Sequence, residues 1–213
     1  PKYKNKVAAF GAWDAYNRIL NEEKSKILVV NGFENLPLKN KNANLLNTML
    51  QDSYKPFGKE ECLDVFTHHA AFEYLKTNKP KVLYISYGET DEWAHHGHYR
   101  DYLNAANQVD KWSESIWNYI QSTPQYKNKT ALFITTDHGR GDSVKKEWTS
   151  HNSKIVGANE IWFAVMAPGI KEKGEVKTNT QLYQKQFAQT MATLLGLTFT
   201  CEHLVGEKIN LNE

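Results

Sequence analysis

Short apolar runs alternate with amphipathic stretches along the chain, which predicts strands followed by helices. The apolar runs are nearly continuous, as in strands that are buried on both faces of a sheet. They cover residues 7–10, 27–30, 82–87, 131–136 and 161–166. Helical spacing of apolar side chains predicts helices at about residues 14–20, 42–51, 59–77, 99–121 and 183–195. This order favours the α/β fold class, as a three-layer α/β/α sandwich with a mostly parallel central sheet.

Three of the predicted helices carry specific expectations. In the helix at 59–77, Cys62 is expected to be a small core residue. The last helix is expected to end at Gly196, a residue type typical of helix C-termini. The helix at 99–121 is expected to turn one set of side chains inward, namely Leu103, Ala106, Val109, Trp112, Ile116, Trp117 and Ile120.

Length and charge restrict the kind of protein that the sequence encodes. The 213 residues fit one α/β domain that spans residues 1–213, and 40% of them are apolar. The formal charge is +2 with acids and bases interspersed, so no basic face for nucleic acid is expected. No apolar run approaches the roughly 18 residues of a membrane span. Cys62 and Cys201 match no metal-binding spacing, and a disulfide between them stays open.

Two of the predicted strands end in clusters of carboxylate and imidazole side chains. Asp91 and His95 follow the strand at 82–87, and Asp137 and His138 follow the strand at 131–136. His151 lies in a polar loop further along. Carboxylate oxygen and imidazole nitrogen are ligands for zinc and also suit manganese. In open α/β sheets, ligands bind beyond the carboxyl ends of the strands, where these clusters are expected.

The spacing within each cluster is compatible with metal binding. Asp91 and His95 are four residues apart, which places both on one face of a helical turn. Asp137 and His138 are adjacent and converge only in an irregular turn, which Gly139 permits. Each pair alone is more often a surface pair or an ordinary turn. Their occurrence after two consecutive core strands, at the same predicted edge of one sheet, favours a metal site. The remaining histidines are expected to be structural or exposed, namely His68, His69 and His203.

The order of these motifs resembles the alkaline phosphatase superfamily. The resemblance rests on an Asp-x-x-x-His, then Thr135-Thr136-Asp137-His138-Gly139 at a strand end, then a later lone His, and it covers residues 81–197. It is closest to the branch of nucleotide pyrophosphatases/phosphodiesterases and cofactor-independent phosphoglycerate mutases. The resemblance implies an alkaline phosphatase-like fold and two divalent metal ions, zinc or alternatively manganese. It also implies one ion on Asp91, His95 and His151, and a second on Asp137 and His138.

Several assignments near these ligands stay open. In a phosphopentomutase-like variant of the pattern the His lies one position later, at His96; the four-residue spacing favours His95, and His98 is a further candidate. Arg140 could hold a substrate phosphate or sulfate with its planar guanidinium, or form an ion pair within its loop. Asp14 is a candidate substrate contact.

The family's catalytic nucleophile has no convincing match in the sequence. In the family a Ser or Thr at a helix N-terminus, and a further Asp ligand, come from the N-terminal part of the domain. We therefore expect the chain to be the C-terminal portion of a longer alkaline phosphatase-like catalytic domain, with the nucleophile upstream of Pro1. By itself such a chain would be inactive or nearly so. The resemblance slightly favours a periplasmic or other extracytoplasmic location.

The expected function is metal-dependent hydrolysis of small phosphate monoesters or phosphodiesters. A phosphoglycerate mutase-like phosphomutase and a sulfatase are the enzymatic alternatives. No cap domain of the mutase kind is evident between Asp14 and Lys81, which favours a hydrolase. The alternative from another class is a metal-stabilised binding domain without catalysis. The sequence leaves the oligomeric state open.

Overall fold

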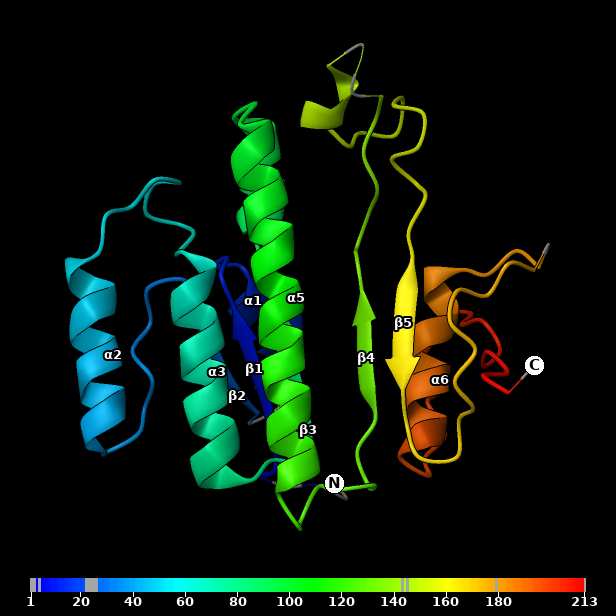
Figure 1. Ribbon diagram of the computed structural model, residues 1–213, viewed down its shortest axis with the longest axis horizontal. Coiled ribbons are helices and arrows are strands. Elements are labelled where there is room, and N and C mark those ends of the chain that lie inside the picture. The colour runs from blue at the N-terminus through cyan, green and yellow to red at the C-terminus, as the bar shows by residue number, and fades with distance from the viewer. Residues whose placement is uncertain are drawn as a thin grey trace. The chain divides into compact units, whose positions relative to one another are not determined.

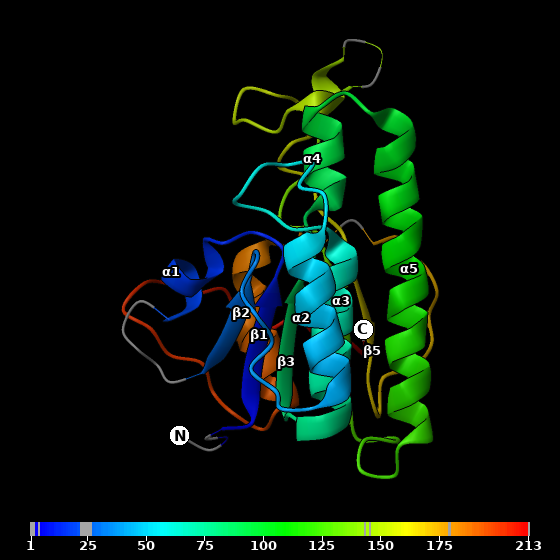
Figure 2. The same cartoon turned by 90° about the vertical axis from the view of Figure 1, so that its left-hand side faces the viewer.

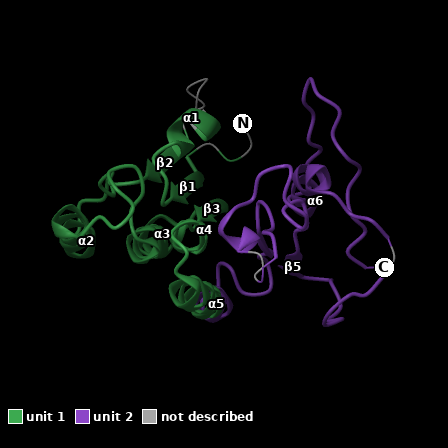
Figure 3. Ribbon diagram, turned by 90° about the horizontal axis from the view of Figure 1, so that it is seen from above, with its two compact units in different colours: residues 1–116 green, residues 117–213 purple. Residues whose placement is uncertain are grey.

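The computed structural model describes residues 3, 5–21, 27–142, 144, 146–178 and 180–212 (Figure 1). The chain divides into two compact units, residues 1–116 and residues 117–213 (Figure 3). The sequence-based assignment of residues 1–213 to a single domain stays a prediction.

A parallel sheet forms the centre of the first unit. Its strands are β1 (Val7–Gly11), β2 (Leu28–Asn31) and β3 (Val82–Ser86), in the order β2-β1-β3 (Figure 2). Both pairings of β1 are parallel, with Ala9 opposite Val29 and Tyr84. All three strands therefore end at one edge of the sheet. The predicted α/β fold class, with parallel strands alternating with helices, is confirmed.

In the described part of the chain, five helices follow the strands of this sheet. They are α1 (Tyr16–Asn21), α2 (Lys41–Asp52), α3 (Asp64–Asn78), α4 (Glu89–His95) and α5 (Tyr99–Ser122), which ends in the second unit. Helix α3 packs against β1 and β3, and α2 packs against α3. The N-terminus of α2 is capped by Asn40, whose Oδ1 accepts a hydrogen bond from the amide of Ala43 at 2.8 Å.

The main core of the first unit lies between the sheet and α3. Phe10 on the central strand is 1% exposed, and its ring contacts that of Tyr74 on α3 at a centroid distance of 5.5 Å. Small side chains at Ala8 and Ala71 let the helix approach the strands closely. The buried members of this cluster are Ala8, Phe10, Val30, Leu36, Ala43, Ala71 and Tyr74.

Helix α3 begins five residues later than the sequence predicted. The preceding segment instead bonds to the chain that follows β1, with Asp14 N donating to Glu60 O at 2.8 Å and Cys62 N to Ala12 O at 3.1 Å. These backbone bonds take the place of helical ones. Cys62 is buried, as predicted, but it lies outside the helix. Cys62 and the exposed Cys201 are both free thiols, so the disulfide left open by the sequence is not formed.

A two-stranded sheet and one helix form the core of the second unit. Strands β4 (Leu132–Thr135) and β5 (Phe163–Met166) pair antiparallel, and α6 (Phe187–Leu194) follows two short 3-10 helices at Glu147–Thr149 and Gln184–Gln186. The rings of Phe133 and Phe163 stack at 5.3 Å, and Phe187 meets both edge-on. Gly196 has a φ of +66°, which confirms the predicted glycine stop after the last helix.

Two expectations about the packing were wrong in detail. The sequence predicted one mostly parallel sheet, whereas the described strands form two separately hydrogen-bonded sheets, and β4 pairs antiparallel with β5. Apolar periodicity carries no information on strand direction or partner, so the sequence could not specify this. On α5, Ile116 and Ile120 are buried as predicted, whereas Leu103 and Ala106 are exposed. Among the described residues, no helix combines the length and apolarity required to cross a membrane.

His68 is buried among aromatic rings between α3 and α5. Its Nδ1 lies 3.0 Å from the hydroxyl of Tyr87, and its ring stacks on Trp112 at 4.7 Å. Burial, and secondarily the charge of His69, lowers the pKa of His68 from 6.5 to about 4. The sequence predicted that His68 and His69 are structural or exposed, which agrees with a buried His68 and an exposed His69.

We expect His68 to make the protein less stable in mild acid. Below pH 6.5 the unfolded chain binds a proton that the folded chain excludes, so this stability is present above that pH and is lost as pH falls towards 4. The loss should reach about 3 kcal/mol. Urea unfolding at several pH values should show this slope in the wild type and a smaller one in His68→Phe, whose ring keeps the stacking. Asp64 and Glu61 titrate in the opposite sense, but they are present in both proteins and cancel in the difference. A difference that does not vary with pH would contradict the prediction.

Candidate metal centre

The first pair of candidate ligands lies on α4, directly after β3. Asp91 and His95 are one helical turn apart, and Oδ2 of Asp91 is 3.2 Å from Nε2 of His95. Both side chains are partly exposed. The N-cap residue of α4 is Gly88, and its carbonyl oxygen accepts a hydrogen bond from the amide of Asp91 at 2.9 Å. A carboxylate oxygen and an imidazole nitrogen therefore converge on the face of α4 that the four-residue spacing predicts.

The neighbouring histidines make other contacts. Nδ1 of His96 donates to the carbonyl oxygen of Glu92 at 2.8 Å, which holds His96 on a different face of the helix from Asp91. The ring of His98 stacks on Trp93 at 5.5 Å, and its Nδ1 lies 3.7 Å from Oδ2 of Asp101. Within the first unit, the geometry thus joins Asp91 to His95 and not to His96 or His98.

The second pair lies in the second unit, directly after β4. Nε2 of His138 is 3.7 Å from Oδ2 of Asp137. Nδ1 of His138 donates to the carbonyl oxygen of Gly139 at 3.1 Å. This bond assigns a hydrogen to Nδ1, so Nε2 is the ring nitrogen that would bind a metal. Metal-binding histidines commonly have such a backbone acceptor on the other ring nitrogen.

His151 joins His138 in the second unit. The two rings stack in parallel, with centroids 3.7 Å apart and an interplanar angle of 8°. His151 follows the 3-10 helix at Glu147–Thr149, which brings this loop back towards the end of β4. The stacked pair therefore places two imidazole rings in one small region, and imidazole nitrogen is a common metal ligand.

The Asp-His-Gly turn is held by close backbone contacts. The amide of Gly139 donates to the carbonyl oxygen of Ala158 at 2.9 Å. A Cβ at Gly139 would overlap the carbonyl oxygens of Gly157 and Glu160. The sequence predicted a sharp turn at Gly139, but its φ is not positive. Glycine is required here because another backbone segment approaches too closely for a side chain.

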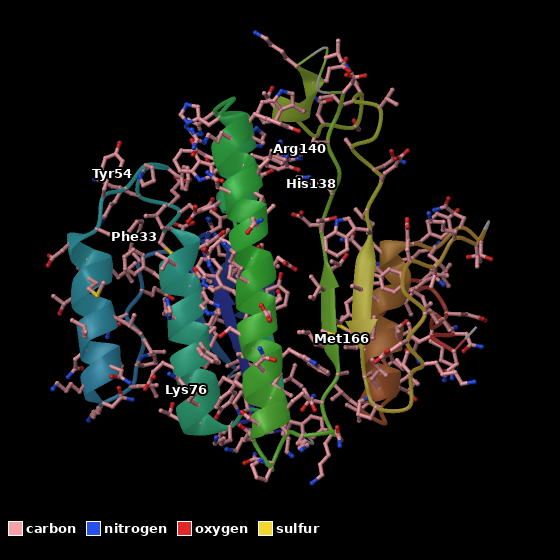
Figure 4. All side chains as sticks on the ribbon, viewed as in Figure 1. Phe33, Tyr54, Lys76, His138, Arg140 and Met166 are labelled. Atoms are coloured by element: carbon pink, nitrogen blue, oxygen red, sulfur yellow. The ribbon has the colours of Figure 1, made fainter. Side chains whose placement is uncertain are left out.

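Arg140 and Asp14, the two candidate substrate contacts, lie after different strands. Nη1 of Arg140 donates to the carbonyl oxygen of Trp148 at 3.2 Å; Figure 4 labels Arg140 and His138 on the segment that follows β4. Asp14 is exposed after β1, and its carbonyl oxygen accepts from Nδ2 of Asn31 at 2.6 Å. Because β1 and β3 are parallel, Asp14 lies at the same edge of the first sheet as Asp91.

Two buried carboxyl groups at this edge were not singled out from the sequence. Glu61 is 7% exposed, and its Oε1 has no hydrogen-bond partner among the described residues. Burial, with the negative charge of Glu92 next in size, raises the pKa of Glu61 to about 9. Asp64 is 1% exposed, and burial raises its pKa to about 7 although the amides of Gly88 and Glu89 donate to it. In a sequence, an acidic residue at the start of an amphipathic helix usually indicates an exposed first turn. The burial of Glu61 and Asp64 is therefore visible only in the tertiary structure.

The donor atoms fit divalent metal ions. Each pair offers one carboxylate oxygen and one imidazole nitrogen, a ligand set suited to zinc and acceptable to manganese. The family model described as the Metalloenzyme superfamily matches residues 24–198, which is most of the chain and includes both pairs and His151. No curated protein and no solved structure shows significant similarity to the chain.

Proposed function

Because the chain belongs to the Metalloenzyme superfamily, within the alkaline phosphatase-like clan, we propose that it provides the metal ligands of a phosphate ester hydrolase. Membership of this family supports a metal-dependent enzyme of the alkaline phosphatase-like type. The reaction, the substrate class and the ligand assignment below are the proposal.

One observation carries the proposal. In each of two segments that follow a strand, a carboxylate oxygen and the Nε2 of a histidine lie within 3.7 Å of each other. Such convergence of ligand atoms is typical of a metal site. Surface ion pairs of this kind contribute little to stability, so folding alone gives no strong reason for both pairs.

We assign Asp91, His95 and His151 to one divalent ion, and Asp137 and His138 to the other. This division follows the resemblance to alkaline phosphatases. Zinc is the expected metal and manganese the alternative, because both accept mixed oxygen and nitrogen ligands.

The chemistry is in-line displacement at phosphorus. Two bound divalent ions would supply positive charge to the attacking and leaving oxygens. Arg140 would bind the non-bridging oxygens of the phosphate through its planar N–H groups, of which Nη1 already donates to Trp148. Asp14 would contact the remainder of the substrate from the carboxyl edge of the first sheet. A sulfate ester presents similar oxygens, so a sulfatase is the alternative that the test must separate.

A substrate panel tests the proposed reaction. The native protein that carries this sequence should be freed of metal, reconstituted with zinc or manganese, and assayed with an aryl phosphate, an aryl phosphodiester and an aryl sulfate. We expect metal-dependent hydrolysis of one or both phosphate esters, abolished by a chelator and restored by added metal. Hydrolysis of the sulfate alone would identify a sulfatase. If the protein binds neither zinc nor manganese, the metal site and the proposed function are both wrong.

A further inference from the structure

Helices α3 and α4 both begin without a cap from their own N-cap residue. The N-cap of α3 is Leu63 and that of α4 is Gly88, and neither forms a side-chain hydrogen bond to its helix. The first amides of an α-helix have no partner within the helix and need acceptors from elsewhere. The two N-termini lie next to each other in the first unit (Figure 2).

The two helices cap each other through their first residues. Oδ1 and Oδ2 of Asp64, the first residue of α3, accept the amides of Gly88 and Glu89 at 2.7 and 3.0 Å. In return, Oε1 of Glu89, the first residue of α4, accepts the amide of Asp64 at 2.8 Å. The other oxygen of Glu89 accepts Nε1 of Trp93 at 3.1 Å. Because Asp64 is 1% exposed, water does not compete for its two bonds.

These bonds connect Asp64 to the backbone of a proposed metal ligand. The peptide unit between Gly88 and Glu89 has its N–H bonded to Asp64 and its carbonyl oxygen bonded to the amide of Asp91 at 2.9 Å. The carboxylate of Asp64 on α3 therefore holds the orientation of this peptide plane, and the helical turn that carries Asp91 begins there. His95 follows on the same face one turn later, 3.2 Å from Asp91.

We propose that Asp64 is a positioning residue for the metal ligands of α4. The inference rests on the proposed metal site, since it assigns Asp64 the task of holding Asp91 and His95 in place before an ion binds. Asp64 touches neither metal nor substrate and acts through the backbone of Gly88 and Glu89. Groups that orient metal ligands in this indirect way typically contribute 10- to 100-fold to metal affinity, so an effect of about that size is expected here.

Asp64→Asn is the most direct test. The amide has nearly the same shape, but its NH₂ group must face one of the two backbone amides, so one hydrogen bond becomes a contact between donors. We expect zinc binding to be weaker by about 10- to 100-fold. Amide hydrogen exchange at Gly88, Glu89 and Asp91, measured without metal, should be faster than in the wild type. Asp64→Ser, which can still accept one amide, serves as the second variant if Asp64→Asn does not fold.

Asn40→Ala provides a matched control in the same unit. It removes the cap of α2 and the 3.2 Å hydrogen bond from Nδ2 of Asn40 to Glu73 on α3, and it touches none of the bonds that join Asp64 to α4. Loss of the cap alone should lower the free energy of unfolding by about 1 kcal/mol. Its zinc affinity should equal that of the wild type, which separates general destabilisation from loss of ligand positioning.

The outcomes distinguish failure of the inference from failure of the proposed function. Faster exchange on α4 together with weaker zinc binding, in the Asp64 variant but not in Asn40→Ala, supports the positioning role. Unchanged zinc affinity in the Asp64 variant overturns that role and leaves the metal site intact. Unchanged exchange on α4 likewise overturns it. A wild-type chain that binds neither zinc nor manganese overturns the proposed function and the inference with it.

Discussion

Alanine at Asp137 is expected to remove one bound zinc ion per chain and to leave the other in place. Asp137 would supply one of the two ligand atoms that this chain gives to its ion, with Nε2 of His138 3.7 Å away. Loss of a direct ligand should exceed the 10- to 100-fold that indirect partners contribute, so affinity at that site should fall by more than about 100-fold. Zinc titration of the purified chain by calorimetry, with the metal content measured after dialysis, would show this directly.

The reciprocal substitution makes the test specific. Asp91→Ala should remove the other ion, and the double variant should bind none. His96→Ala is the matched control for the histidine register, because His96 bonds to Glu92 and not to Asp91. Equal zinc binding in the wild type and in both Asp variants would contradict the metal site. A loss in His96→Ala that equals the loss in His95→Ala would contradict the assignment of His95.

The geometry within each ligand pair follows from the sequence, because it depends on a few neighbouring residues. A four-residue interval on a helical turn places Asp91 beside His95 wherever that helix lies. Similarly, the strand-terminal position of Asp137 and His138 required only the apolar run at 131–136. Which residues act as ligands stays a prediction until metal binding is measured.

The hydrogen bonds that hold the start of α4, which carries Asp91 and His95, join distant segments of the chain. The sequence pattern does not indicate such contacts. Asp64 and Glu89 are 25 residues apart, and nothing in their spacing indicates that each caps the other's helix. The late start of α3 has the same origin, since Cys62 bonds to Ala12 fifty residues earlier. Position 139 likewise requires glycine because the carbonyl groups of Gly157 and Glu160 leave no space for a Cβ. In each case, backbone groups find partners that only the folded chain brings close.

The other large expected effect concerns the core beneath the carboxyl edge of the first sheet. Phe10 lies on the central strand, is 1% exposed and packs against Tyr74 of α3. Phe10→Ala leaves a cavity that the rigid strand and helix cannot close, and such substitutions cost about 3–5 kcal/mol. That is a large fraction of the roughly 5–15 kcal/mol by which domains are stable.

Urea unfolding, followed by circular dichroism, should therefore show Phe10→Ala unfolding at a much lower denaturant concentration than the wild type, with Tyr54→Ala as the matched control. Tyr54 is 82% exposed, so its truncation should change stability by less than about 0.5 kcal/mol. Because α3 carries both Tyr74 and Asp64, loosening this core should also weaken the hold of Asp64 on α4. Zinc should then restore part of the lost stability, since a ligand that binds only the folded state favours it. A Phe10→Ala protein as stable as Tyr54→Ala would show that this cluster does not hold α3 on the sheet.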